Sequence, residues 1–139
     1  MKLSAIIPTG NEEHNIVNAI KSVDFADEII IVDSFSKDNT IKLATKLADT
    51  ILQREYINSA SQKNWAIPQA KFEWIFLIDA DERVPLDLKE EILEVLSSEN
   101  NFSGFWIKRQ NYFMGKKIHF SGWRGDKVKK NSKKIGSNY

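Results

Sequence analysis

The sequence contains no cysteine among its 139 residues. Without thiols the chain has no disulfide framework, no thiolate metal ligand and no cysteine nucleophile. Proline and glycine are also scarce, with three and six copies, which excludes collagen-like and low-complexity proteins. Hydrophobic residues make up 42% of the chain and charged residues 28%, as in ordinary globular domains. Length and composition therefore predict one folded domain, and the lack of cysteine is typical of a reducing cytoplasm.

An excess of charge of one sign is missing as well. The formal net charge is +1, so we expect no bulk attraction to nucleic acid and no nucleic-acid partner. No apolar run approaches the length of a membrane-spanning helix, and the N-terminal run is too short for a signal peptide. We therefore expect a cytoplasmic protein, with peripheral contact at the inner face of a membrane left open.

Strand-like and helix-like patterns alternate through the first hundred residues. The predicted strands are Leu3–Pro8, Glu28–Asp33, Thr50–Gln53 and Trp74–Asp79, all short apolar runs typical of buried parallel strands. The predicted helices start after a cap at Asn11, after a cap at Asp38 or Asn39, at about Ser59 and at Pro85. This order predicts an α/β fold, in which right-handed crossovers build a mostly parallel sheet flanked by helices.

The pattern changes after about residue 97. Gly104–Arg109 and Lys117–Phe120 read as strands joined by a turn near Met114 and Gly115, which predicts a C-terminal β-hairpin or a crossing pair of strands. From residue 126 onward the chain is rich in lysine and has almost no apolar content, so we expect it to be disordered. The predicted organisation is one domain over residues 1–126 and a disordered basic tail over residues 127–139.

The strongest local signal for chemistry is the pair Asp79 and Asp81 at the end of an apolar run. Carboxylates at i and i+2, where a strand gives way to a loop, can converge on one divalent cation, and Mg²⁺ and Mn²⁺ prefer such oxygen ligands. The same pattern is also typical of a capped turn before a helix. The residues alone leave both interpretations open.

A second carboxylate, Asp33, also ends a predicted strand. Ligands of open α/β sheets bind beyond the carboxyl ends of the strands, so Asp33 could accept a hydrogen bond from a ring N–H or a ribose hydroxyl. Ser36, Asp38 and Asn39, which come after it, are better explained as caps of the next helix. The neighbouring residues 8–13 hold one glycine and form no glycine-rich phosphate loop.

Four motifs then occur in a fixed order. They are Ile6-Ile7-Pro8-Thr9-x-Asn11-Glu12-Glu13, Ile31-Val32-Asp33-Ser34-x-Ser36-x-Asp38-Asn39-Thr40, Gln62-Lys63-Asn64-Trp65-Ala66 and Leu77-Ile78-Asp79-Ala80-Asp81-Glu82. Together they resemble family 2 glycosyltransferases, and most of all the bacterial branch that adds sugars to the lipopolysaccharide core. Residues 113–117 and 121–123 resemble that branch too, so the likeness covers roughly residues 2–126. It implies a GT-A fold, which is a Rossmann-like sheet that binds a nucleotide sugar.

The resemblance implies a role for each matching position. The implied nucleotide-binding residues are Pro8, Thr9, Glu12, Asp33, Lys63 and Asp79, and the implied ligands of Mn²⁺ or Mg²⁺ are Asp81 and Asp79. Asp33 would hydrogen-bond the base, commonly uracil, and Asp81 would hold the metal ion on the diphosphate. Without the resemblance, Lys63 reads equally well as part of a solvated helix face.

Two departures from the family pattern qualify this expectation. Gly10 stands where the family usually has an aromatic residue that stacks on the base, which predicts weaker donor binding, by on the order of 1 kcal/mol. Complete members are also longer, and they carry the acceptor site and the catalytic base beyond the hairpin. No catalytic residue is therefore predicted here.

The sequence thus predicts the donor-binding part of an inverting glycosyltransferase. Its donor would be a nucleoside-diphosphate sugar, with UDP-sugar favoured, and its acceptor a lipopolysaccharide or another glycan or lipid-linked molecule. The alternative is a catalytically inactive nucleotide-binding or dimerising module, because an open sheet edge can pair two copies into a homodimer. A nucleotidyltransferase is disfavoured, since the first strand is not followed by a loop rich in glycine and arginine.

Overall fold

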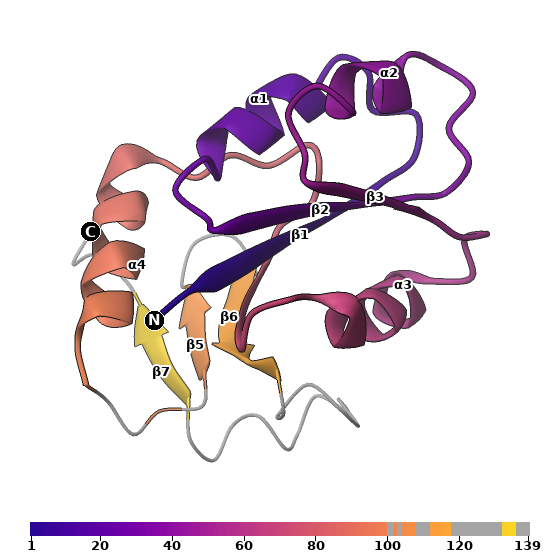
Figure 1. The fold of residues 1–139 in the computed structure, drawn as a ribbon. Helices are drawn as coiled ribbons and strands as arrows, with labels where there is room; N and C mark the ends of the chain where they lie inside the picture. The colour runs from indigo at the N-terminus through magenta and orange to yellow at the C-terminus, as the bar shows by residue number, and fades with distance from the viewer. Residues whose placement is uncertain (100–101, 103, 108–111, 118–131, 136–139) are drawn as a thin grey trace.

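The computed structural model describes residues 1–99, 102, 104–107, 112–117 and 132–135 (Figure 1). The strands are β1 Leu3–Thr9, β2 Glu28–Asp33, β3 Thr50–Gln53, β4 Trp74–Leu77, β5 Gly104–Ile107, β6 Tyr112–Lys116 and β7 Ser132–Ile135. The helices are α1 Ile16–Ser22, α2 Thr40–Ala44, α3 Ser59–Ala66, the 3₁₀ helix η1 Ile67–Gln69, and α4 Leu86–Ser97. The predicted α/β alternation over the first hundred residues is confirmed.

The seven strands form one sheet in the order β3-β2-β1-β4-β6-β5-β7. The four strands β1 to β4 are mutually parallel, while β6 runs antiparallel to both β4 and β5. In the register, Thr9 lies beside Asp33, and Asp33 lies beside Gln53. The carboxyl ends of β1, β2 and β3 therefore meet at one edge of the sheet, where the loops that extend from them gather.

Helices cover both faces of the sheet, which explains why the central strands are mostly apolar. Figure 1 shows α1 and α2 on one side of β1 and β2, and α3 on the other. One core cluster joins α1, α2 and α4 to alternate residues of the strands, and a second joins α3 and η1 to the residues between. Buried on both sides, these strands need hydrophobic residues at most positions, and the exceptions Ser4, Thr9 and Asp33 form hydrogen bonds. Among the described helices, none has both the length and the apolar character of a membrane span.

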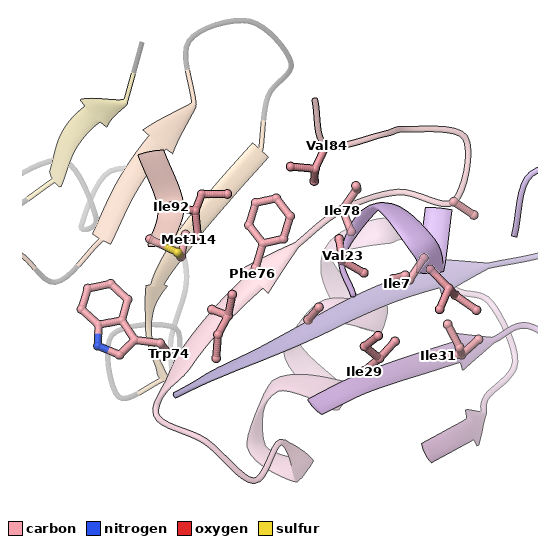
Figure 2. Close-up of a cluster of buried hydrophobic side chains, with 14 of the residues drawn as sticks. Ile7, Val23, Ile29, Ile31, Trp74, Phe76, Ile78, Val84, Ile92 and Met114 are labelled. Atoms are coloured by element: carbon pink, nitrogen blue, oxygen red, sulfur yellow. The ribbon is translucent and has the colours of Figure 1, made fainter. Parts of the chain in front are cut away.

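The larger core cluster is organised around β4. Figure 2 shows Phe76 of β4 near Ile92 of α4 and Met114 of β6, with Trp74 on one side of this group and Ile78, just after β4, on the other. All five side chains are at most 2% exposed. β4 lies in the middle of the sheet, and this packing holds it there.

Several predicted boundaries are shifted. The first helix begins at Ile16 instead of after Asn11, because Asn11 adopts φ 51°, outside the helical region. Residues 13–15 form a turn in which the Glu12 carbonyl accepts the N–H groups of Asn15 and Ile16. The fourth strand ends at Leu77, two residues before Asp79. Pro85 is the residue before α4 and not its first residue.

The predicted hairpin exists, but its second strand lies earlier in the chain than predicted. Met114 and Gly115 lie inside β6, opposite Phe76 and Ile75 of β4, and not in a turn. Met114 is fully buried, so a residue pair typical of a turn is part of the core. Lys117 lies beyond β6, and residues 118–120 of the predicted strand lie outside the described residues.

The predicted disorder of residues 127–139 is wrong for four of them. Residues 132–135 form β7, which pairs in parallel with β5, and the rest of this segment lies outside the described residues. Composition predicted disorder because the segment lacks apolar side chains. A strand at a sheet edge is held by backbone hydrogen bonds, which do not depend on side-chain character.

The packing predicts a large cost for truncating the centre of β4. Phe76→Ala should lower the free energy of unfolding by about 3–5 kcal/mol, because it removes a fully buried ring and leaves a cavity. Urea denaturation measures this loss. The matched control is Leu86→Ala, since Leu86 is 69% exposed and its loss should cost less than about 0.5 kcal/mol. Similar losses in the two variants would contradict the placement of β4 at the centre of the core.

Candidate functional site

A cavity of about 550 Å³ opens at the carboxyl edge of the parallel strands. It lies where β1, β2 and β4 end and where α3 begins. Its lining residues are Pro8, Thr9, Gly10, Asn11, Glu12, Ser34, Tyr56, Ser59, Gln62, Asp79, Ala80 and Asp81. Five of the seven predicted site residues are therefore brought together here. The two others, Asp33 and Lys63, do not line the cavity but contact residues that do.

The loop after β1 (residues 10–15) and the loop after β2 (residues 34–40, which ends at the first residue of α2) are joined by reciprocal hydrogen bonds. The N–H of Asn11 donates to Ser36 Oγ at 2.8 Å, and Asn11 Oδ1 accepts from the N–H of Lys37 at 2.8 Å. This double contact explains the positive φ of Asn11, a conformation that asparagine tolerates better than most residues. The side chain predicted to cap a helix instead joins two loops.

The same two loops are joined further along by Glu12 and Glu13. The N–H of Glu12 donates to Thr40 Oγ1 at 2.9 Å, and the N–H of Glu13 donates to Asp38 Oδ2 at 3.2 Å. In return, Glu13 Oε2 accepts from the N–H of Asn39 at 3.1 Å. The loops that form one wall of the cavity therefore hold each other in place through contacts of their own.

Asp38 is the acceptor at the centre of this junction. Its Oδ1 accepts from the Thr40 hydroxyl and from the Thr40 N–H at 2.9 Å. The hydrogen bond from the Thr40 side chain is the main cause that lowers the pKa of Asp38 below its ordinary value. Of the two caps predicted for this helix, Asp38 supplies the side-chain hydrogen bond, and Asn39 does not.

Asp33 is fully buried behind the cavity wall, and the protein itself occupies its oxygens. Oδ1 accepts from Thr9 Oγ1 at 3.1 Å and from Ser36 Oγ, while Oδ2 accepts from the Ser36 N–H at 2.8 Å. Gln53 Nε2 lies 3.5 Å from the same Oδ2. Asp33 thus fixes the positions of Thr9 and Ser36. Direct contact with a base, which the resemblance implies, would require one of these donors to move.

Three carboxylates gather on the opposite side of the cavity. One oxygen each from Asp79, Asp81 and Glu82 lies within 4.8 Å of the others, which is close enough to share one cation. Lys63 Nζ lies 3.7 Å from Asp79 Oδ1 and offsets part of their mutual repulsion. An all-oxygen set of this kind suits Mg²⁺ or Mn²⁺.

The hydrogen bonds of this turn separate the two interpretations of Asp79 and Asp81. In a capped turn, these aspartates would accept backbone N–H groups. Here Glu82 Oε1 accepts the N–H of Asp79 at 3.2 Å, and Asp81 makes no side-chain hydrogen bond to any described residue. Both aspartates are exposed to the cavity. This arrangement favours the cation site over the capped turn.

An arginine holds the acidic turn against the first loop. Arg83 Nη1 donates to the carbonyls of Ala80 and Glu82 at 3.0 and 2.7 Å. Its Nη2 donates to Asn15 Oδ1 at 3.1 Å, and Asn15 Nδ2 donates to Glu12 Oε2 at 2.9 Å. Both walls of the cavity are therefore connected through one chain of hydrogen bonds.

The family model of glycosyl transferase family 2 matches residues 4–137 of this chain. The chain belongs to glycosyl transferase family 2. Curated relatives agree with this assignment. A lipopolysaccharide core biosynthesis glycosyltransferase, LpsC from Rhizobium meliloti, is 34% identical over 120 residues, covering 83% of this chain and 44% of the relative. An uncharacterized glycosyltransferase of Rickettsia bellii is 40% identical over 100 residues, covering 71% of this chain and 34% of the relative. The chain thus spans less than half the length of these relatives.

Solved structures share the fold of this family 2 chain. Mannosyl-3-phosphoglycerate synthase from Rubrobacter xylanophilus has a TM-score of 0.78 at 13% identity, covering 98% of this chain and 66% of that one. Glucosyl-3-phosphoglycerate synthase from Mycobacterium tuberculosis, solved with Mn²⁺, UDP and glucosyl-3-phosphoglycerate, has a TM-score of 0.74 at 14% identity, covering 97% of this chain and 70% of that one. The predicted GT-A fold is confirmed.

Sequence reasoning missed several lining residues of the family 2 cavity. Ser34 comes directly after Asp33, and Gln62 directly before Lys63, so both stand inside motifs that were recognised. Tyr56 and Ser59 come from the region where β3 gives way to α3, and no pattern there indicated a role. The motifs located the right segments, but they did not show which side chain in each segment faces the cavity.

The lowered pKa of Asp38 predicts a pH dependence of the junction between the loops. A carboxyl whose pKa is lowered by folding stabilises the fold above its unfolded pKa, about 3.9, and loses that contribution as pH falls through the folded value. Asp38→Asn should therefore melt at a lower temperature than wild type at pH 7. The difference should shrink below about pH 4, because only the wild type has a carboxylate at position 38 that is neutralised there.

Thermal melts of both proteins between about pH 3 and pH 7 measure this effect. Asp24→Asn serves as the control, since Asp24 is exposed, lies between α1 and β2, and forms an ion pair with Lys89 far from the junction. A difference between wild type and Asp38→Asn that stays constant over this pH range would contradict a role for the ionised Asp38.

Proposed function

We propose that this chain is the donor-binding part of an inverting glycosyltransferase, which binds a nucleoside-diphosphate sugar, preferably UDP-sugar, together with Mn²⁺ or Mg²⁺. One observation carries the proposal: a cavity at the carboxyl edge of the sheet has an acidic cluster on one side and hydrogen-bonding loops on the other. Such a cavity offers separate places for a charged diphosphate and for an uncharged nucleoside.

The acidic side suits the diphosphate. Asp81 and Asp79 would hold the divalent cation, with Glu82 close enough to share it. When bound, the cation would neutralise charge on the diphosphate leaving group. Lys63, 3.7 Å from Asp79, can turn its ammonium toward the phosphates once the cation takes over the charge of Asp79. The crystal of the Mycobacterium tuberculosis enzyme with Mn²⁺ and UDP supports this class of ligand.

The other side suits the nucleoside. Pro8, Thr9 and Glu12 line the cavity there, and the hydrogen bonds among the loops fix their positions before a ligand binds. Asp33 contributes by fixing Thr9. Ordering these groups before binding lowers the entropy that association costs. The contact between Asp33 and the base that the resemblance implies would require Thr9 or Ser36 to release an oxygen of Asp33.

The acceptor is proposed from the relatives. The name of LpsC, at 34% identity, supports a lipopolysaccharide core or another glycan or lipid-linked acceptor. An acceptor of this kind would place the protein in the cytoplasm at the inner face of the membrane. Because the chain covers 44% of LpsC, the acceptor is a proposal that rests on the relative's name. Transfer of sugar from a nucleotide donor to a defined acceptor tests it.

A second candidate function is an inactive module that binds a nucleotide in the same cavity but transfers no sugar. Its strand β3 lies at the open edge of the sheet and could pair with a second copy of the chain. The two candidates share a nucleotide site and differ in whether sugar is transferred. Measuring transfer, after binding has been established, separates them.

The donor site is tested by thermal shift with UDP, with and without Mn²⁺. UDP and Mn²⁺ together should raise the melting temperature of the wild type. At a ligand concentration of about 100 Kd, binding adds about 2.7 kcal/mol to the free energy of unfolding. Asp81→Asn should lose most of the Mn²⁺-dependent part, because it removes a charged cation ligand without changing side-chain size. The variant without ligand should be as stable as wild type, since the Asp81 side chain makes no hydrogen bond to a described residue.

Asp24→Asn is the matched control, because it removes the same charge from an exposed residue at the opposite edge of the sheet. It should respond to UDP and Mn²⁺ like the wild type. GDP and CDP, titrated in parallel, report the preference for uracil. If none of the nucleotides shifts the wild-type melting temperature, the donor site does not exist in this chain.

A further inference from the structure

One polar atom beside the cavity has no partner among the described residues. Gln62 is 1% exposed, and its Oε1 is buried without a hydrogen bond to any of them. A buried acceptor left unpaired costs roughly 1–3 kcal/mol, so folded proteins rarely keep one without a reason. Gln62 also lines the cavity, which makes a bound ligand the natural source of the missing donor.

The surroundings of Gln62 do not satisfy both ends of its amide. Its Nε2 donates to Ser34 Oγ at 3.0 Å. If the amide rotated by half a turn, the Ser34 hydroxyl could donate to Oε1, but Nε2 would then be the unpaired group. In either orientation one end of the amide lacks a partner within the described part of the chain.

In the orientation observed, the Gln62–Ser34 pair presents two complementary groups. Gln62 Oε1 is an available acceptor, and Ser34, which accepts from Nε2, keeps its own O–H for donation. An N–H next to a carbonyl, as on the imide edge of uracil, matches this pair. Because Oε1 is closed to water, contact requires a small rotation of the Gln62 side chain toward the cavity.

Asp33, the residue expected to accept the base N–H, is less available. Its oxygens already accept from Thr9 and from Ser36, and its side chain is fully buried. We propose that Gln62, with Ser34 beside it, is the specificity-determining acceptor for the ring N–H of the nucleobase. The inference rests on the proposed function, since it assigns a residue within the same nucleotide site.

Gln62→Met tests the inference, because methionine keeps the length of the side chain and removes both polar atoms. The Kd for UDP with Mn²⁺, measured by calorimetry, should rise about tenfold, which corresponds to one lost hydrogen bond of about 1.4 kcal/mol. The melting temperature of the variant without ligand should stay close to that of wild type, since the unpaired oxygen disappears together with the bond to Ser34. A merely structural glutamine would instead show a loss of stability with UDP affinity unchanged.

Gln69→Met is the matched control. Gln69 is an exposed glutamine whose Nε2 donates to the carbonyl of Trp65 at 3.0 Å, and it does not line the cavity. This variant should bind UDP as the wild type does. A weakening equal to that of Gln62→Met would overturn the inference.

Modified ligands identify the group that Gln62 contacts. N3-methyl-UDP lacks the ring N–H, so it should bind the wild type weakly and should lose no further affinity in Gln62→Met. 2′-Deoxy-UDP keeps the ring N–H and should lose about tenfold in the variant, as UDP does. If the variant weakens N3-methyl-UDP as much as UDP but leaves 2′-deoxy-UDP unaffected, the partner is the ribose and the inference is wrong. Failure of wild type to bind UDP would instead refute the proposed function.

Discussion

The site depends on the hydrogen bonds that join the loop after β1 to the loop after β2. Adjacent parallel strands bring these loops together, but parallel pairing stops where the strands end. Beyond that point, Asn11 and Glu13 exchange hydrogen bonds with residues 36–39, and both loops contribute side chains and backbone N–H groups. Because each bond pairs a side chain with a backbone N–H, the two loops hold a defined shape without regular structure. The cavity wall, the position of Thr9 and the burial of Asp33 all depend on this junction.

Negative charge is concentrated on one side of the cavity, and this asymmetry favours one orientation of a bound ligand. Asp79, Asp81 and Glu82 concentrate negative charge beyond β4, and Lys63 lies beside them as a neighbouring cation. On the other side, Asp33 is enclosed by donors from its own chain, and Glu12 is the one carboxylate among the described lining residues there. If the proposed donor binds, its diphosphate is therefore favoured on the side where three carboxylates can share a cation.

The sequence predicted the elements around the site better than the contacts inside it. Continuous apolar runs identified β1, β2 and β4, because strands buried on both faces leave no other pattern. The spacing of Asp79 and Asp81 predicted the acidic cluster, since neighbouring residues need no knowledge of the fold to be placed together. Asn11 was misread as a cap because its partners, Ser36 and Lys37, lie 25 and 26 residues away. Met114 and the β7 residues were misread because sheet pairing with β4 and β5 outweighed local composition.

The order of the elements has a consequence for how the protein is made. Among the described residues, all those that line the cavity lie between residues 8 and 81, and β1 to β4, which precede or contain them, are adjacent in the sheet. Ribosomes deliver the chain from its N-terminus, and early segments can fold before later ones emerge. The cavity can therefore assemble while later segments are still being synthesised, with β6 and then β5 adding to an edge that already exists. The lining residues would then come together before Arg83 and the packing of α4 and β6 against β4 fix their positions.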